Sequence, residues 1–212
     1  MAVRQILLLG DPDLSKVSEP VALTSPATYA GTDSEPDPGT YAVTHTETYA
    51  AADVEANESR VPRFLKNLES LETLFTDLKD TLEHYRAAHG EGIAISAPQI
   101  GVRKRVVYLE PRPGVATVLI NPEIAPLGRG MVETWENCMS FPNLLVRVRR
   151  HKYCSLAYCD QSGRRVTTAI WGGLSVVLQH ECDHLDGILA IDKALDVRSN
   201  AAHAAKHGRI RP

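Results

Sequence analysis

The chain has 212 residues, of which 43% are hydrophobic and 23% are charged, as is usual for a folded domain. Its 23 Lys and Arg are set against 26 Asp and Glu, and the net charge of −3 excludes a strongly basic DNA-binding protein. Four Cys are too few for a disulfide scaffold, so we expect a reducing, cytoplasmic location. The longest apolar run near the start, residues 6–9, is too short for a signal peptide or a membrane span.

The negative charge is concentrated in one part of the chain. Residues 21–60 contain seven acidic residues and a single basic one, Arg60, and they show neither helical nor strand periodicity. This composition predicts a surface insertion or long loop within a single domain that spans residues 1–195. A docking segment for a basic partner is the functional alternative. Residues 196–212 are expected to form a basic, solvated tail, with contact to RNA or a ribosome as the alternative.

The first predicted helix covers residues 62–89. Leucine and aromatic residues recur there at steps of three and four positions, from Leu65 to Tyr85, which indicates an amphipathic helix. Pro62 suits the first helical turn, and Gly90 suits the position just past the end. A stripe of this kind is typical of core packing, so it predicts no function.

The rest of the chain reads as strands followed by a second helix. Strands are expected at residues 102–109, 115–120, 144–148, 153–159 and 165–170. The last two predict a hairpin, because Asp-Gln-Ser-Gly at residues 160–163 is a turn sequence. Residues 174–185 return to helical periodicity, with apolar residues on one side and His, Glu and Asp on the other.

The second predicted helix contains an H-E-x-x-H pattern at residues 180–184. Two residues four positions apart lie on one face of a helix, so His180 and His184 can share a metal ion. Glu181 lies beside them, where a carboxylate can take a proton from a metal-activated water and return it later. The pattern is short and also occurs on exposed helices that bind no metal. A third ligand residue is therefore needed to distinguish a metal site from an ordinary exposed helix.

Cys138 is the best candidate for the third ligand. One class of zinc proteases adds a His at the position of Ala190, and another adds a downstream Glu, but no Glu follows Glu181 in this chain. An H-E-x-x-H metalloprotease is therefore the disfavoured alternative. A thiolate and two imidazoles leave one coordination position open, as catalytic zinc sites require. His203 and His207 remain as other candidates in the polar tail.

Three stretches of the sequence are distinctive: GIAISAPQIG at residues 92–101, ENCMS at residues 136–140 and QHECDHLDG at residues 179–187. In this order they resemble the G-x-G-L-A-A-P-Q-I-G, E-G-C-L-S and Q-H-E-x-D-H-L-x-G motifs of peptide deformylases. Residues 5–14 also resemble the first strand and turn of that family. The chain is therefore identified as a divergent member of the peptide deformylase family with an insertion near its N-terminus.

The resemblance implies both a fold and an activity. The fold is of the α+β class, with antiparallel β-sheets packed around a central helix that carries the H-E-x-x-H pattern. The activity is a metal-dependent hydrolysis that removes the N-formyl group from the N-terminal methionine of newly synthesised polypeptides and releases formate. The expected partners are N-formyl-Met peptides or nascent chains, with proximity to the ribosome, but neither DNA nor a membrane. The sequence sets no oligomeric state.

The resemblance also assigns roles to single residues. The implied metal ligands are Cys138, His180 and His184. Glu181 is implied as the general base and acid, while the side chain of Gln99 and the backbone N–H of Met139 are implied as hydrogen-bond donors to the formyl oxygen. The site would hold one divalent ion, with Fe(II) as the native metal and Zn(II), Ni(II) or Co(II) as alternatives.

Six positions are expected to bind the substrate: Glu91, Ile93, Ala94, Asn137, Gly173 and Val176. Gly173 and Val176 lie seven and four residues before His180, on the same side of the helix, where small side chains leave room for methionine. Ordinary core packing is the alternative for Val176. The other four match family positions along the peptide path, where an extended chain can bind by strand addition.

Three departures from the family motifs bear on the activity. Ala94 and Asn137 each replace a Gly, and Met139 replaces a Leu. A methyl group at Ala94 narrows the peptide channel, whereas Asn tolerates the positive φ that Gly permits. These departures support the alternative of a deformylase-like protein with altered or lost activity that binds N-terminal peptides.

Overall fold

The computed structural model describes residues 2–23 and 61–200. Residues 24–60 of the predicted insertion and residues 201–212 of the predicted tail, which include His203 and His207, lie outside this range. The helical elements are η1 (Pro12–Ser15), α1 (Val61–His89), η2 (Ala97–Ile100), α2 (Gly172–Leu185) and η3 (Ala190–Lys193), where η marks a 3-10 helix. Within the described residues, the model contains no helix with the length and hydropathy needed to cross a bilayer.

Two antiparallel sheets form the β part of the fold. The first has five strands in the order β1 (Ala94–Ser96), β2 (Val106–Arg112), β3 (Val115–Pro126), β6 (Tyr153–Cys159) and β7 (Arg165–Trp171). The second has three strands in the order β4 (Met131–Glu136), β5 (Leu144–His151) and β8 (Asp196–Ser199). The α+β class predicted from the sequence is therefore confirmed.

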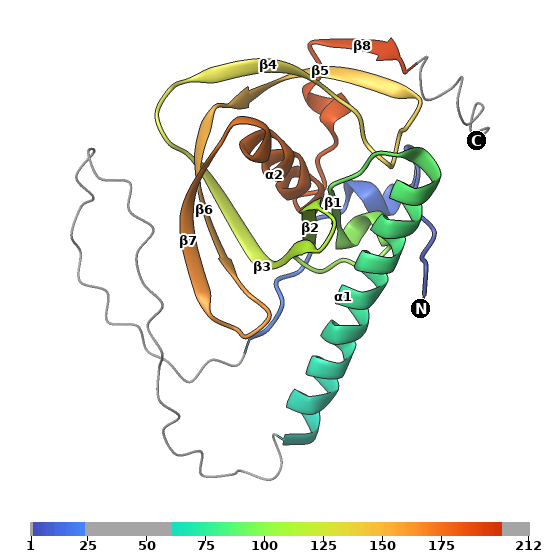
Figure 1. Cartoon of the computed structure of the whole chain (residues 1–212), viewed down its shortest axis with the longest axis vertical. Helices are drawn as coiled ribbons and strands as arrows, with labels where there is room; N and C mark the ends of the chain where they lie inside the picture. The colour runs from blue at the N-terminus through green and yellow to red at the C-terminus, as the bar shows by residue number, and fades with distance from the viewer. Residues whose placement is uncertain (1, 24–60, 201–212) are drawn as a thin grey trace.

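Helix α2 lies between the two sheets (Figure 1). It contacts five strands of the first sheet and β5 of the second, so strands surround it on several sides. Leu178 and Leu185 of α2 are almost fully buried in a cluster with Val107 and Leu119 of the first sheet. Because α2 contains residues 180–184, this packing holds the H-E-x-x-H pattern in the interior of the domain.

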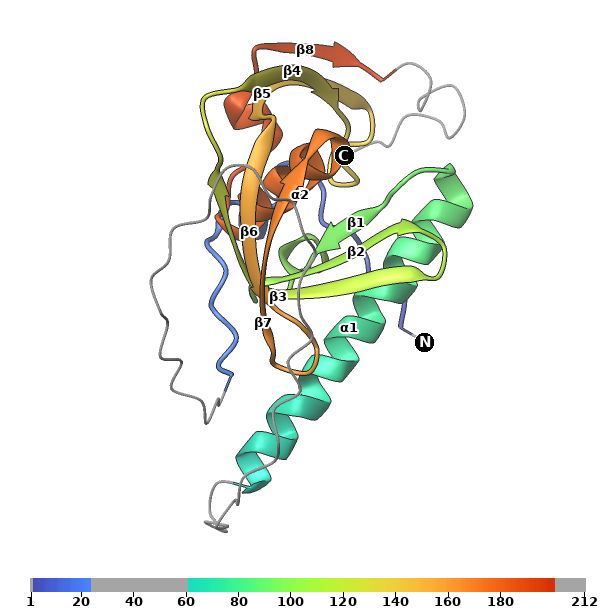
Figure 2. The ribbon, with the colours of Figure 1, turned by 60° about the vertical axis from the view of Figure 1, so that its left-hand side comes forward.

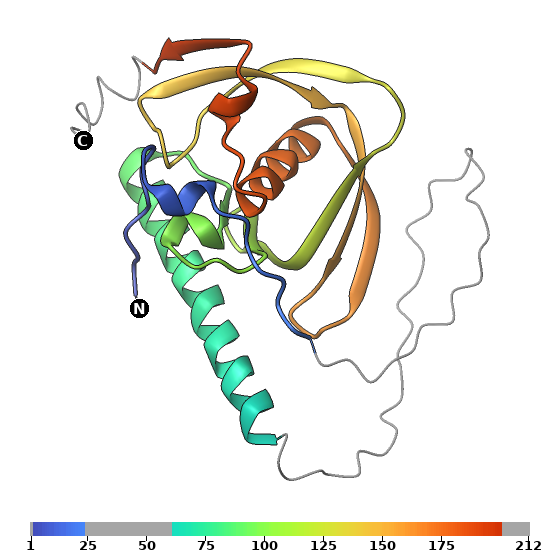
Figure 3. The ribbon, with the colours of Figure 1, turned by 180° about the vertical axis from the view of Figure 1, so that it is seen from behind.

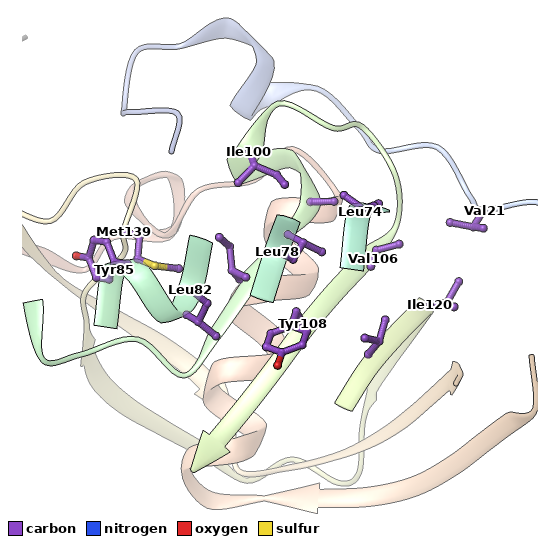
Figure 4. Close-up of a cluster of buried hydrophobic side chains, with 13 residues drawn as sticks. Val21, Leu74, Leu78, Leu82, Tyr85, Ile100, Val106, Tyr108, Ile120 and Met139 are labelled. Carbon is purple, nitrogen blue, oxygen red and sulfur yellow. The ribbon is translucent and has the colours of Figure 1, made fainter. Parts of the chain in front are cut away.

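Helix α1 covers the outer face of the first sheet. Figure 2 shows it crossing β1, β2 and β3 at an angle, with its first turns extending beyond the sheet. The leucine stripe faces the strands as predicted, because Leu78 and Leu82 are fully buried in one cluster with Val106 and Ile120 (Figure 4). Each fully buried leucine stabilises the fold by roughly 1.5–3 kcal/mol. The helix ends at His89, and Gly90 follows with φ of 76°, as the sequence predicted.

The N-terminal segment closes the far side of the domain. Seen from behind in Figure 3, it passes the end of α2 and lies against η2. The N–H of Ser18 donates to the carbonyl of Leu185, and a Cβ on Gly187 would come within 2.7 Å of the Ser15 carbonyl oxygen. Gly187 is thus required at this close approach, and its φ of 70° also favours glycine.

The observed strands differ from the predicted ones at several places. The hairpin of β6 and β7 is confirmed, and its turn is held by the Asp160 carboxylate, which accepts from the N–H groups of Ser162 and Arg164. Strands β1 and β4 were not predicted, and β2 begins at Val106 rather than at residue 102. The predicted tail also needs correction, because residues 196–199 form β8 and pair with β5. These short strands are held in place by main-chain hydrogen bonds to neighbouring strands. Such bonds do not require an alternating pattern of hydrophobic residues in the sequence.

An ion pair joins the end of α1 to β2. Arg86 donates to the Glu110 carboxylate at 2.8 Å and to the backbone carbonyls of Gly92 and Glu110 at 3.0 Å. The Glu110 side chain is 5% exposed and also accepts from the N–H of Gly114. Burial alone would raise the pKa of Glu110, but the Gly114 N–H and the Arg86 guanidinium outweigh it and lower the pKa. Through Arg86, this pair fixes the segment that leads into β1.

We expect Glu110→Gln to reduce the free energy of unfolding by about 1–3 kcal/mol at pH 7, because charge-assisted hydrogen bonds are lost. The folded-state pKa of Glu110 lies below the ordinary 4.5, so its contribution is present above pH 4.5 and is lost as the pH falls through the folded pKa. Urea unfolding at pH 7 and below pH 4 should therefore show a gap between wild type and variant that narrows in acid. A gap that stays constant or widens would contradict this account.

Candidate active site

Three potential metal ligands converge in the interior of the domain. The Nε2 atom of His184 lies 3.2 Å from the Sγ of Cys138 and 3.2 Å from the Nε2 of His180. All three ligand atoms lie within 4.8 Å of one another, and all three residues are buried. Two imidazole nitrogens bound to one tetrahedral zinc ion lie about 3.3 Å apart, given Zn–N distances of about 2.0–2.1 Å. The spacing and the chemistry of this donor set therefore fit a single divalent ion.

The chain places these ligands by two different elements. His180 and His184 lie one turn apart on α2, and their rings meet edge to face with centroids 4.8 Å apart. Cys138 comes from the turn that follows β4, and it packs in a cluster with Phe141, Val146 and Val148. The second sheet thus carries the cysteine to the helix from a position more than 40 residues earlier in the chain.

Glu136 sets the orientation of His180. The Nδ1 of His180 lies 3.0 Å from the Oε2 of Glu136, and both side chains are buried. Burial would raise the pKa of Glu136, but hydrogen bonds from Arg150 and His180 outweigh it and lower the pKa to about 2. An ionised carboxylate only accepts hydrogen bonds, so Nδ1 carries the proton and the lone pair of Nε2 is directed to the metal position.

Arg150 compensates the buried charge of Glu136. Its guanidinium donates from Nε to Oε1 at 2.8 Å and from Nη2 to Oε2 at 2.9 Å, which is a bidentate pair. Its third nitrogen, Nη1, donates to the Asp183 carboxylate, which also accepts from Lys193 at 2.6 Å. The Arg150 side chain is only 3% exposed. One arginine of β5 therefore holds both the orienting carboxylate and a residue of α2.

Gln99 presents its amide nitrogen to the same site. Its Oε1 accepts from the backbone N–H of Ser96 at 2.9 Å and from the Ser96 hydroxyl at 3.0 Å. These two donors fix which end of the amide is oxygen, so Nε2 points the other way. There it lies 3.6 Å from the Sγ of Cys138 and 3.4 Å from the Oγ of Ser140. A donor in this position can bind an oxygen that gains negative charge.

Glu181 is a buried carboxylate beside the ligands. Burial raises its pKa, and the nearby His180 and Ser96 only partly offset that effect. Its Oε2 has no hydrogen-bond partner among the described residues. A carboxylate with a raised pKa and an unused oxygen is suited to accept a proton and release it again.

A cavity of about 320 Å³ opens onto this cluster. Five of the six predicted substrate positions line it: Glu91, Ile93, Ala94, Asn137 and Val176. Gln99, Cys138, Met139, His180 and Glu181 line it as well. These predicted catalytic and substrate-binding residues therefore line one cavity, whose size suits a methionine side chain and a short stretch of peptide.

Two expectations are not supported by the structure. Gly173 is exposed at the start of α2 and is not among the residues that line this cavity, so its part in binding methionine stays a prediction. Asn137 does not adopt a positive φ, since Asn121 is the only non-glycine residue with one in the described part of the chain. The backbone conformation at position 137 therefore does not require asparagine.

Other lining residues were not foreseen from the sequence. Val177, three residues before His180, faces the cavity beside Val176, and the same helical spacing could have indicated it. Tyr85 reaches the cavity from α1, and Trp135 reaches it from β4. The guanidinium of Arg198 in β8 lies 4.4 Å from the centroid of the Trp135 ring, so the corrected tail segment supports the cavity wall. No local signal in the sequence marks these contacts.

Comparison with known proteins decides the family. The sequence profile described as polypeptide deformylase matches residues 50–200, which is more than half of the chain. The chain belongs to the peptide deformylase family. A deformylase of Leptospira biflexa is 30% identical over 203 residues, which cover 91% of this chain and 88% of that protein. The deformylase of Fusobacterium nucleatum is 43% identical over 103 residues, which cover 49% of this chain but only 59% of that protein.

Solved deformylase structures share the fold. The deformylase of Legionella pneumophila superposes with a TM-score of 0.63 and 28% identity, covering 91% of this chain and 86% of that one. The deformylase of Acinetobacter baumannii, solved with Met-Ala-Ser bound, gives a TM-score of 0.61 at 23% identity and covers 91% and 98%. Solved deformylases that differ widely from this chain in sequence thus share its overall fold.

We expect Arg150→Met to lower the free energy of unfolding by about 3–5 kcal/mol, because it leaves the buried Glu136 carboxylate without its bidentate partner and removes one donor from the partly buried Asp183. Metal affinity should fall by about 10–100-fold, because His180 loses its fixed orientation. The matched control is Arg149→Met on the same strand, where the side chain is 57% exposed and should change stability by less than about 1 kcal/mol. Equal effects of the two variants on melting and metal titration would refute this role for Arg150.

Proposed function

We propose that this protein is a metal-dependent hydrolase that removes the N-formyl group from the N-terminal methionine of newly synthesised polypeptides. The observation that carries the proposal is the convergence of Cys138, His180 and His184 next to Glu181 in a cavity that Gln99 also lines. Membership in the deformylase family supports it. A related deformylase has been solved with Met-Ala-Ser, which corresponds to a deformylated N-terminus.

The donor set points to one divalent ion held by Cys138, His180 and His184. A metal ion with an open coordination position activates water and polarises a carbonyl oxygen. A thiolate with two imidazoles suits Fe(II) or Zn(II), and we propose Fe(II) as the native metal, with Zn(II), Ni(II) or Co(II) as substitutes. Glu136 and Arg150 keep the His180 ring directed at the ion.

The protein residues supply the proton transfers and the charge stabilisation. Glu181 takes a proton from the attacking water through its unpartnered Oε2 and passes it to the amide nitrogen as the bond from the formyl carbon to nitrogen breaks. The products are formate and a free N-terminal amine. Nε2 of Gln99 and the backbone N–H of Met139 bind the formyl oxygen while it carries negative charge. Ser96 holds Gln99 in the orientation that this step needs.

The substrate binds in the same cavity. Val176 and Val177 give an apolar wall for the methionine side chain, and Ile93 and Ala94 lead into β1. Strand β1 lies at the edge of its sheet, so an extended peptide can add to its free side through main-chain hydrogen bonds. Such bonds demand little of the peptide's side chains, which suits an enzyme that acts on many nascent chains near the ribosome in the cytoplasm.

We expect the Fe(II)-loaded protein to release formate from formyl-Met-Ala-Ser under anaerobic conditions. Glu181→Gln should keep the metal but lower kcat by about 10²–10⁴-fold, because the proton acceptor is lost. The matched control is Glu123→Gln, since Glu123 is 71% exposed at its side chain and is not among the residues that line the cavity. Metal content and formate release are measured on the same samples.

Three outcomes would contradict the proposal. Full activity of Glu181→Gln would remove the carboxylate from the mechanism. A freshly loaded, folded wild type that binds the peptide without releasing formate would favour a deformylase-like binding protein. Cleavage of an internal bond in an unformylated peptide would favour a metalloprotease.

A further inference from the structure

A hydrogen bond spans the substrate cavity between its two walls. Nδ2 of Asn137 donates to Oε2 of Glu91 at 2.8 Å, and both residues line the cavity. Glu91 precedes β1 on one wall, and Asn137 follows β4 on the other, directly before the ligand Cys138. The bond therefore joins two segments that are 46 residues apart in the chain.

The second oxygen of Glu91 is also unusual. Oε1 is buried and has no hydrogen-bond partner among the described residues. Through Oε2 the carboxylate accepts from the Asn137 amide, and Glu91 lines the cavity. The Asn137 amide is therefore the contact that holds this carboxylate at the cavity.

The bridge lies along the direction in which a bound peptide leaves the metal. Ser96, at the far end of β1, contacts Gln99, which in turn contacts Cys138, so this end of the strand is next to the ligands. Glu91 lies five positions earlier in the chain. At about 3.3 Å per extended residue, a peptide that follows β1 from the ligands reaches Glu91 after roughly three to five residues.

We infer that the Glu91–Asn137 pair limits the length of peptide that the cavity accepts: short N-terminal peptides bind beneath the intact bridge, and longer chains bind only after it opens. This inference rests on the proposed function for the identity of the ligand. Only long peptides have to break this hydrogen bond when they bind, so the pair makes the affinity of the cavity depend on peptide length. The asparagine at position 137, which has no backbone requirement there, is explained by this side-chain contact.

The test measures binding, so that it does not depend on turnover. The probes are Met-Ala and Met-Ala-Ser-Ala-Ser-Ala, both with amidated C-termini so that no terminal carboxylate approaches Glu91. Their Kd values for the metal-loaded protein are obtained by calorimetry for wild type, Glu91→Gln, Asn137→Asp and the double variant. The Asp variant is nearly isosteric with Asn but places one carboxylate against another and breaks the bridge. Glu91→Gln keeps an acceptor for Asn137 and preserves it.

In Asn137→Asp, the Kd of the long peptide should fall by about fivefold relative to that of the short one, which corresponds to one weak hydrogen bond. Adding Glu91→Gln should restore the wild-type ratio, because the new glutamine donates to the aspartate. Glu91→Gln alone keeps the bridge, so its ratio of the two Kd values should stay close to the wild-type ratio. Melting curves verify that all four proteins are folded.

The inference is overturned if the ratio of the two Kd values is the same in Asn137→Asp and wild type, or if the double variant fails to restore it. Absence of binding of either peptide to the folded, metal-loaded protein would overturn it as well. The proposed function fails in a different way, through absent formate release with the length preference in binding intact.

Discussion

The bidentate pair between Arg150 and Glu136 is the contact on which the site depends, because it allows a charged carboxylate to remain ionised in the interior. An isolated buried charge would be unstable, whereas here the guanidinium supplies matched donors. Glu136 is then free to fix the His180 ring, and Asp183 extends the same network to α2. Breaking this pair would loosen the ligand geometry and the contact between sheet and helix together.

The fold serves to bring two distant ligand sources to one point. Helix α2 gives two imidazoles at a spacing that any helix provides, but the thiol needs a second sheet to deliver it. Strand β4 leads into Cys138, β5 carries the Arg150 that holds Glu136 beside His180, and β8 completes that sheet. On the other side, the edge strand β1 leads into η2, which carries Gln99. The residues proposed to bind the metal and act in catalysis therefore come from α2, η2 and the turn after β4, which the two sheets hold together.

Much of this site could be predicted from the sequence, because its parts are local. The two histidines share a face through helical spacing, and Cys138 stands in a motif whose neighbours resemble a known family. Contacts between residues that are distant in the chain could not be predicted in this way. Arg150 is one of several arginines in β5, and only the structure distinguishes it from the exposed Arg149. The contact of Arg198 with Trp135 was missed for the same reason, since β8 is four residues long and has no periodicity.

The central claim is that Cys138, His180 and His184 bind one metal ion together. X-ray absorption spectroscopy of protein loaded with one equivalent of Zn(II) tests it most directly. The account predicts one sulfur ligand at about 2.3 Å and two imidazole nitrogens at about 2.0–2.1 Å, with the sulfur lost in Cys138→Ser. A spectrum with only nitrogen and oxygen ligands, or a sulfur that persists in Cys138→Ser, would contradict it.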